Sequence, residues 1–273
     1  MTEAAVTELA MIAPAAAPRA AGGRISVRLD QVMVEYPIYS AYSRSLKRSV
    51  LHVSTGGRLG LNTRDRVVVQ ALNDVTLHFD QGDRVGLVGA NGAGKTTLLR
   101  VMAGVYEPVL GKVEINGRVT SLFDLSLGID PEATGLENIL LRGLVLGLTP
   151  QQIEEKRDEI IAFSDLGQYI EMPVRTYSAG MGLRLAFAVS TCIRPEILLM
   201  DEWIGVGDAN FTKKAEERAA ALIGDAGIMV IATHSPVLIE RTCNRAIWLD
   251  HGTVRADGSP REVLSAYDAE SRA

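Results

Sequence analysis

One nine-residue stretch constrains the fold of this chain more than any other feature. Residues 89–97 read Gly-Ala-Asn-Gly-Ala-Gly-Lys-Thr-Thr and fit the pattern G-x-x-x-x-G-K-[ST]. Residues 83–88 before it predict a short buried strand, and residues 97–103 after it predict the first turns of a helix that ends at Gly104. Strand, glycine loop and helix in this order are typical of a phosphate-binding loop. The chain is therefore predicted to bind a nucleotide here.

Each residue type in the loop has a physical task. The glycines let consecutive backbone N–H groups turn toward a polyphosphate with no Cβ in the way, and the helix N-terminus adds partial positive charge. Lys95 can reach the β- and γ-phosphates, and the Thr96 hydroxyl can ligate Mg²⁺. The predicted nucleotide-binding residues of the loop are Gly89, Asn91, Gly92, Ala93, Gly94, Lys95, Thr96 and Thr97.

Composition excludes several classes of protein. The 273 residues carry a net charge of −5, so they offer no basic footprint and nucleic acid is not favoured as the main partner. The two cysteines, Cys192 and Cys243, fit no metal-ligand spacing and are expected to be reduced core thiols. No stretch reaches the roughly 18 apolar residues of a membrane span. Glu3 and Glu8 stand where a signal peptide has basic residues, so we expect a soluble, cytosolic chain.

The order of predicted elements indicates an α/β fold with a mainly parallel sheet covered on both sides. Apolar runs at 197–200 and 227–233 predict buried parallel strands, and alternation over 24–36 predicts a half-buried strand. We expect a disordered, Ala- and Pro-rich arm at 1–23, one domain at 24–268 with a helical subdomain at about 125–177, and a tail at 269–273.

Four local features carry more specific expectations. Residues 67–69 and 75–79 predict a pair of strands, and Asn116-Gly117 predicts the turn of a hairpin at 111–119. Residues 45–51 predict a short basic amphipathic helix, and residues 54–65 predict a long loop.

Polar residues at predicted strand ends are candidates for chemistry on the nucleotide. Asp201 and Glu202 follow an apolar run, at the sheet edge where parallel sheets bind ligands. Asp201 can hold Mg²⁺, and Glu202 can accept a proton from the water that attacks the γ-phosphate. An Asp-Glu pair alone would more often be a solvated start of a loop, and the phosphate-binding loop favours the metal and base roles. His234 also follows a strand, and from spacing alone a structural role stays open.

Two further groups have both a functional and a structural interpretation. Ser178, Ala179 and Gly180 stand at the start of a predicted helix, where small residues expose N–H groups to an anion, but they also form a good N-cap. Tyr36, Tyr39 and Tyr42 near a strand end could stack on a base or pack on the surface.

Taken together, these stretches resemble the ATPase subunits of ABC transporters over residues 25–267. The ordered motifs are the phosphate-binding loop, a signature at 177–181, the apolar run ending in Asp201-Glu202, a D-loop at 205–208 and the switch residue His234. The family's signature is commonly Leu-Ser-Gly-Gly-Gln, whereas this chain has Tyr-Ser-Ala-Gly-Met. This variant, the Thr-Gly-Leu-Glu-Asn at 134–138 and the Val-Gly-Asp-Ala-Asn-Phe at 206–211 resemble polysaccharide exporters of the O-antigen, teichoic-acid, capsule and wall-galactan type.

The resemblance implies roles for single residues. Tyr36 would stack on adenine, Glu202 would be the general base, and His234 would contact the γ-phosphate. Ser178, Ala179 and Gly180 would touch the ATP held by a second copy, so that a head-to-tail homodimer has two shared sites. Asp208 would belong to the D-loop. Asp124 occupies the place of the family's Q-loop glutamine and is a further candidate for contact with Mg²⁺.

By the same resemblance, the chain is expected to be an energising subunit on the cytoplasmic face of a membrane. Two copies would bind and hydrolyse ATP and drive a separate integral-membrane permease that exports a lipid-linked polysaccharide. Residues 128–169 would dock the permease, with the helix at 45–51 near it. Because the chain stops just past its final predicted helix, we expect no C-terminal carbohydrate-binding domain. The alternatives are a soluble ABC-type ATPase of DNA repair or translation, and a nucleotide-binding regulator that does not turn over.

Overall fold

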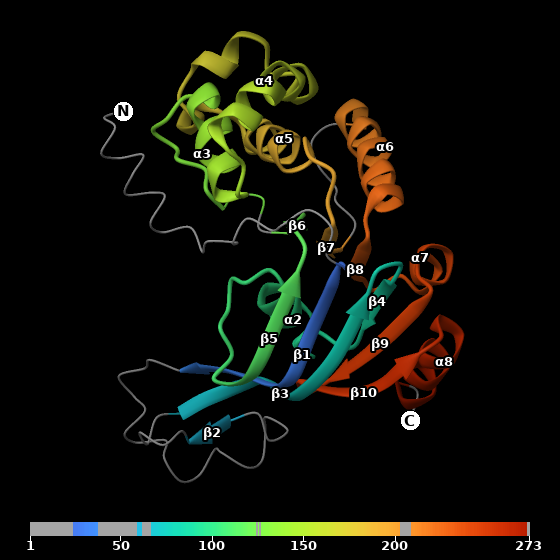
Figure 1. The fold of residues 1–273 in the computed structure, drawn as a ribbon. Helices are drawn as coiled ribbons and strands as arrows, with labels where there is room; N and C mark the ends of the chain where they lie inside the picture. Colours follow the sequence, from blue (N-terminus) through green and yellow to red (C-terminus); the bar gives the residue numbers. More distant parts are fainter. Residues whose placement is uncertain are drawn as a thin grey trace. The chain divides into compact units, whose positions relative to one another are not determined.

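The computed structural model describes residues 24–37, 59–61, 67–123, 125, 127–202 and 209–271 (Figure 1). They form two compact units. The first is Arg118–Gly227, and the second joins Arg24–Gly117 to the stretch that begins at Ile228. In the part of the chain that is described, no helix combines the length and the apolar character that crossing a membrane requires.

An antiparallel sheet forms one layer of the second unit. Its four strands have the order β2-β3-β1-β5. The alternating apolar residues of β1 lie in the core, with Val27, Leu29 and Val32 fully buried, because successive side chains of a strand point to opposite faces. The strands are β1 (Ser26–Pro37), β2 (Leu59–Leu61), β3 (Val67–Asp80) and β5 (Leu110–Asn116).

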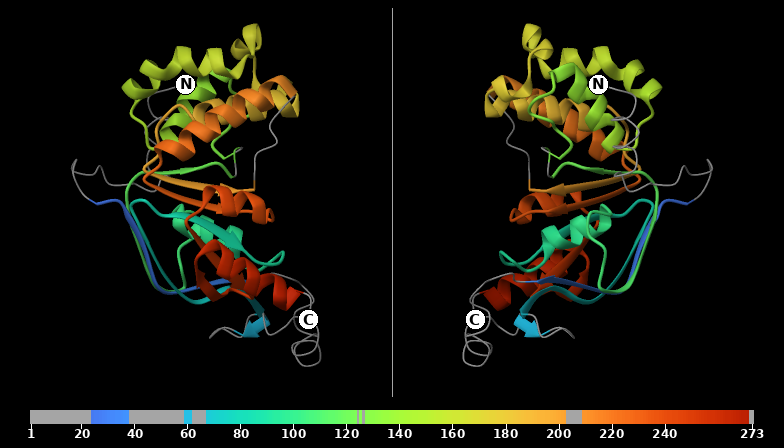
Figure 2. Two further views of the ribbon diagram at one scale, coloured as in Figure 1. Left: turned by 90° about the vertical axis from the view of Figure 1, so that its right-hand side faces the viewer. Right: turned by 90° about the vertical axis from the view of Figure 1, so that its left-hand side faces the viewer.

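A second set of strands in this unit carries the phosphate-binding loop. Strand β4 (Arg84–Val88) pairs in parallel with both β8 (Ile228–Ala232) and β9 (Arg245–Asp250), and β10 (Thr253–Gly258) pairs antiparallel with β9. Every residue of β8 is buried, as a parallel strand covered on both faces requires. The unit's helices are α2 (Lys95–Met102), α7 (Pro236–Thr242) and α8 (Pro260–Ser271) (Figure 2). Ile239 of α7 and Val263 of α8 belong to one buried apolar cluster with Trp248 of β9.

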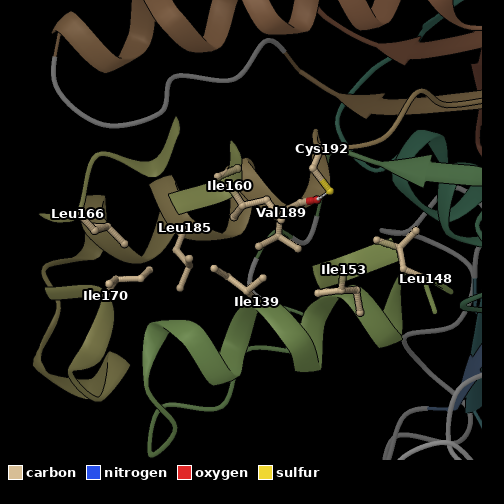
Figure 3. Close-up of a cluster of buried hydrophobic side chains, with 10 residues drawn as sticks. Ile139, Leu148, Ile153, Ile160, Leu166, Ile170, Leu185, Val189 and Cys192 are labelled. Carbon is tan, nitrogen blue, oxygen red and sulfur yellow. Dashed lines mark hydrogen bonds between the residues drawn. The ribbon is translucent and has the colours of Figure 1, made fainter. Parts of the chain in front are cut away.

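The first unit is mostly helical. Its short strand β6 (Val119–Ser121) pairs in parallel with β7 (Ile197–Asp201). Three of its helices, with the 3-10 turn that follows the second, enclose a core of buried aliphatic side chains that point toward one another (Figure 3). The helices of the unit are α3 (Gly135–Val145), α4 (Pro150–Ser164), α5 (Ala179–Ser190) and α6 (Ala209–Asp225), with 3-10 turns η1 (Gly167–Glu171) and η2 (Val174–Thr176).

The predicted α/β fold class is confirmed, with the mainly parallel sheet and the antiparallel N-terminal sheet. Two local predictions are wrong. The predicted hairpin at 111–119 does not form, because β5 pairs with β1 while β6 pairs with β7. The predicted strand pair at 67–79 is one continuous strand, β3, in which Asp74 with φ of 51° absorbs an irregularity of pairing.

Other expectations have different outcomes. The loop predicted at 54–65 contains the short strand β2. The arm at 1–23 and the helix at 45–51 lie outside the described residues. The predicted domain limits stay predictions.

Candidate functional site

The phosphate-binding loop connects β4 to α2, as the sequence predicts. Lys95 is the first residue of α2, and its Nζ folds back to donate hydrogen bonds to the carbonyl oxygens of Gly89 at 2.7 Å and Ala90 at 3.2 Å. Only 8% of Lys95 is exposed. An ammonium group buried among backbone carbonyls is held inside the loop, where a phosphate can take over its hydrogen bonds.

Two glycines fix the path of the loop. Gly89 has φ of 147° and Gly94 has φ of 110°, both in the region that favours glycine. A Cβ on Gly89 would collide with the carbonyl oxygen of Leu249 in β9, and a Cβ on Gly94 would lie 2.7 Å from the carbonyl oxygen of Ala71 in β3. The neighbouring backbone therefore excludes side chains at both positions and holds the loop close to the sheets.

The start of α2 suits an anion. Its N-cap is Gly94, no side chain caps the helix, and its first turn contains no acidic residue. The first N–H groups of a helix have no partner within the helix and carry partial positive charge. Together with Lys95, this end of the helix fits the negative charge of a polyphosphate.

Tyr36 lies against this helix. Its hydroxyl donates a 3.4 Å hydrogen bond to Oγ1 of Thr97, and its ring meets Tyr106 edge to face with centroids 5.5 Å apart. Burial raises the pKa of Tyr36. Arg100 Nη1 donates to the Tyr106 hydroxyl at 3.3 Å, and its guanidinium lies 5.6 Å from that ring. Sequence reasoning found Tyr36 but missed Tyr106 and Arg100, because only the fold brings the end of β1 to α2.

His234 lies at the same edge of the parallel strands as the loop. Strands β4 and β8 are parallel neighbours with Leu87 opposite Ala232, so Gly89 and His234 both follow at the carboxyl ends. The His234 side chain is exposed. This is the edge at which parallel sheets bind ligands.

The carboxylate candidates Asp201 and Glu202 belong to the other unit. Asp201 is the half-buried last residue of β7, and the residues before it are fully or almost fully buried. Glu202 follows, is exposed, and has φ of 63°, a left-handed conformation that costs free energy for a residue with a Cβ. Such backbone strain is commonest at functional sites.

The signature residues stand at the start of α5 in that unit. Ser178 is the N-cap, and its Oγ accepts a 3.3 Å hydrogen bond from the Met181 N–H. Ser178 and Ala179 are exposed and Gly180 is half-buried. The three small residues thus present the helix end at the surface, as an anion contact needs.

Some predicted site residues lie outside the described part of the chain, namely Asp124, Asp208 and the two tyrosines Tyr39 and Tyr42. Among the residues that are described, no three His, Cys, Asp or Glu side chains gather in a way that could hold a metal ion.

Several named proteins are similar to this sequence. A family profile described as ABC transporter matches residues 72–205. The O-antigen export system ATP-binding protein RfbE of Yersinia enterocolitica is 46% identical over 229 residues, which are 84% of this chain and 96% of that protein. The teichoic acids export ATP-binding protein TagH of Bacillus anthracis is 36% identical over 242 residues, covering 89% of this chain and 42% of that protein.

Solved structures show a similar fold. The dimeric structure of the ATP-binding cassette MJ0796 in a post-hydrolysis state, bound to ADP and Pi, matches with a TM-score of 0.61 at 20% identity, over 86% of this chain and 99% of that one. The ATP-binding subunit of an ABC transporter matches with a TM-score of 0.63 at 21% identity, over 89% and 93% of the two chains. At these identities the likeness concerns the fold.

Proposed function

This chain belongs to the ATP-binding proteins of ABC transporters, and on that premise we propose that it hydrolyses ATP to power export of a lipid-linked polysaccharide. The observation that carries the catalytic part is the buried Lys95 at the uncapped start of α2. The substrate class rests on relatives named for export of O-antigen and of teichoic acids. The similarity to export proteins does not favour a role in DNA repair or translation.

In the proposed site, ATP lies along the phosphate-binding loop. Its β- and γ-phosphates replace the carbonyls of Gly89 and Ala90 as partners of Lys95. Tyr36, beside Thr97, offers its ring to the adenine. Thr96 and Asp201 would hold Mg²⁺, with Asp124 as a further candidate. The ion would supply positive charge that offsets the negative charge developing on the phosphate.

Hydrolysis then requires a base and a contact for the γ-phosphate. Glu202 takes a proton from the water molecule, whose oxygen forms a bond to the γ-phosphorus as the bond to the leaving β-phosphate oxygen breaks. His234, at the carboxyl end of β8, contacts the γ-phosphate. The products are ADP and inorganic phosphate.

The proposed working unit is a homodimer in contact with an integral-membrane permease. Ser178, Ala179 and Gly180 of one copy approach the ATP bound by the other, with Asp208 near the interface. Residues 128–169 dock the permease on the cytoplasmic face of the membrane. The exposed apolar side chains of Leu136, Val145 and Tyr169 support this part of the proposal, since they lie on the helices of that segment.

The test separates hydrolysis from export. Purified wild-type protein should release phosphate from ATP with Mg²⁺ and stop when EDTA removes the ion. Cells whose single copy carries Lys95→Ala should keep lipid-linked polysaccharide on the cytoplasmic leaflet, whereas cells with the exposed-site control Lys112→Ala should export it. Normal surface polysaccharide in the Lys95→Ala strain would refute the export function.

A further inference from the structure

Two sequence motifs that lie about 40 residues apart meet in the helical unit. The segment before α3 and the segment before α5 run side by side, joined by an isolated antiparallel bridge between Thr134 and Pro173. Two backbone N–H groups of the later segment donate to carbonyl oxygens of the earlier one, Val174 to Ala133 at 2.9 Å and Arg175 to Pro131 at 2.8 Å. Backbone hydrogen bonds therefore join the segment that leads into the signature to the loop that precedes α3.

That loop is itself held firmly. Asn138 is completely buried, and its Nδ2 contacts the carbonyl oxygens of Asp130, Ala133 and Thr134 at 2.8–3.2 Å. Its Oδ1 accepts a 2.7 Å hydrogen bond from the Asp130 N–H. One amide side chain thus fixes both ends of residues 130–134, so the loop can serve as a rigid support.

Tyr177 closes the junction immediately before Ser178. Its hydroxyl donates a 2.7 Å hydrogen bond to the carbonyl oxygen of Tyr169, and its ring packs against the core of the helical unit. Burial raises the pKa of Tyr177, so the hydroxyl stays protonated and remains a donor. The residue after it caps α5, which leaves no flexible spacer between this anchor and the signature.

Gly135 makes the room that the tyrosine needs. A Cβ at this position would collide with the Tyr177 hydroxyl and would lie 2.8 Å from the carbonyl oxygen of Ile170. Gly135 is helical, and no positive φ requires a glycine there. Its lack of a side chain is explained by the tyrosine hydroxyl and the Ile170 carbonyl, which makes Gly135 and Tyr177 a matched pair.

From these contacts we propose that Tyr177, whose hydroxyl lies next to Gly135, is a positioning residue. It sets the place of Ser178 and transmits movements of loop 130–134 to the signature. The inference rests on the proposed function, because it takes Ser178 to contact the ATP of a second copy. It adds a defined mechanical link between the loop before α3 and that contact. Loss of the link should weaken closure of the dimer and leave ATP binding to each copy's own phosphate-binding loop intact.

The test uses the full chain with Glu202→Gln, which blocks turnover, and adds Tyr177→Phe. Removing the hydroxyl should raise the ATP concentration for half-maximal dimerisation about fivefold, the order expected for one lost hydrogen bond. Affinity for a fluorescent ATP analogue under dilute, monomeric conditions should not change. The matched control is Tyr169→Phe, which removes the same atom from a tyrosine that is 45% exposed and keeps the carbonyl acceptor.

A double-mutant cycle tests the pairing directly. Gly135→Ala should raise the same ATP midpoint by a larger factor when Tyr177 is intact than when Tyr177→Phe is also present, because the second substitution removes the hydroxyl with which the new Cβ collides. Additive effects, or a Tyr177→Phe midpoint equal to that of its parent, would overturn the positioning role. If the Glu202→Gln parent binds ATP and never dimerises, the proposed function fails, and the inference fails with it.

Discussion

The start of α2 and the helices α3–α5 differ in how their polar groups are paired. Helix α4 begins with a complete capping box, in which Thr149 accepts from the Gln152 N–H at 3.2 Å and Gln152 accepts from the Thr149 N–H at 3.0 Å. Helix α3 begins in the same way at Thr134 and Glu137. Helix α2 has only Gly94 at that position and no side-chain cap. Helices α3 and α4 thus satisfy N–H groups of their first turns with their own side chains, whereas α2 begins without a side-chain cap, at the end where the proposed ATP binds.

The contrast extends to buried charge. In helix α3, the guanidinium of Arg142 is 3% exposed and donates to Ser190 Oγ at 2.7 and 3.1 Å and to the carbonyl of Leu127, and burial lowers its pKa to about 10. Lys95 also donates to backbone carbonyls, but its acceptors, Gly89 and Ala90, belong to the phosphate-binding loop. Arg142 therefore has a structural role, whereas Lys95 has hydrogen-bond acceptors that a phosphate can replace.

The largest expected effect is on ATP hydrolysis and comes from a substitution at the start of α2. Lys95→Ala removes the cation that meets the β- and γ-phosphates, so ATP hydrolysis should fall about 100-fold or more. Phosphate release at saturating ATP is the measurement. Lys112→Ala is the matched control, since it removes an exposed lysine paired with Glu114. Hydrolysis within a factor of about two of wild type would show that Lys95 is only structural.

Gly89→Ala tests how strictly the loop is held. The new Cβ meets the Leu249 carbonyl in a backbone conformation that L-residues rarely adopt, so the free energy of unfolding should fall by roughly 3 kcal/mol and ATP binding should be lost. Gly104→Ala is the control, because it has φ of 72° and no atom within 4 Å of its Cβ. Chemical denaturation should show a much smaller loss there, and equal losses would mean that backbone strain alone explains the result.

The pH dependence of stability at Cys192 tests how tightly the core packs at the end of α5. Burial raises the pKa of its thiol to about 11, above an ordinary value near 9. A folded-state pKa that is raised gives stability that is complete below about pH 9 and is lost as the pH rises through about 11. The difference in unfolding free energy between wild type and Cys192→Ala should therefore shrink by about 1 to 2 kcal/mol between pH 8 and pH 10.5. Urea unfolding at both pH values measures it, and an unchanged difference would mean an accessible thiol.

The smallest effect concerns the cap of α4. Thr149→Ala removes the acceptor for the Gln152 N–H, so stability should fall by about 1 kcal/mol while ATP hydrolysis per folded molecule stays the same. Thermal unfolding and phosphate release together test this. A drop in hydrolysis without a drop in stability would mean that the capped helices take part in the chemistry.

Local sequence signals predicted those parts of the molecule that local physics determines. The phosphate-binding loop and the buried parallel strands were both recognisable, because each depends on residues that are neighbours in sequence. The hairpin at Asn116-Gly117 was wrong because β1, which lies far earlier in the chain, is the partner that β5 takes. The pairing of Gly135 with Tyr177 and of Tyr36 with Tyr106 needed the fold as well.

The central claim is that the start of α2 binds ATP and that the signature of a second copy of the chain then covers this ATP. Light scattering during size exclusion of the Glu202→Gln protein tests it most directly. With ATP and Mg²⁺ the mass should double from the 29.4 kDa of one chain, and it should stay at 29.4 kDa without nucleotide or when Lys95→Ala is added. A protein that binds ATP and keeps the mass of one chain would contradict the account.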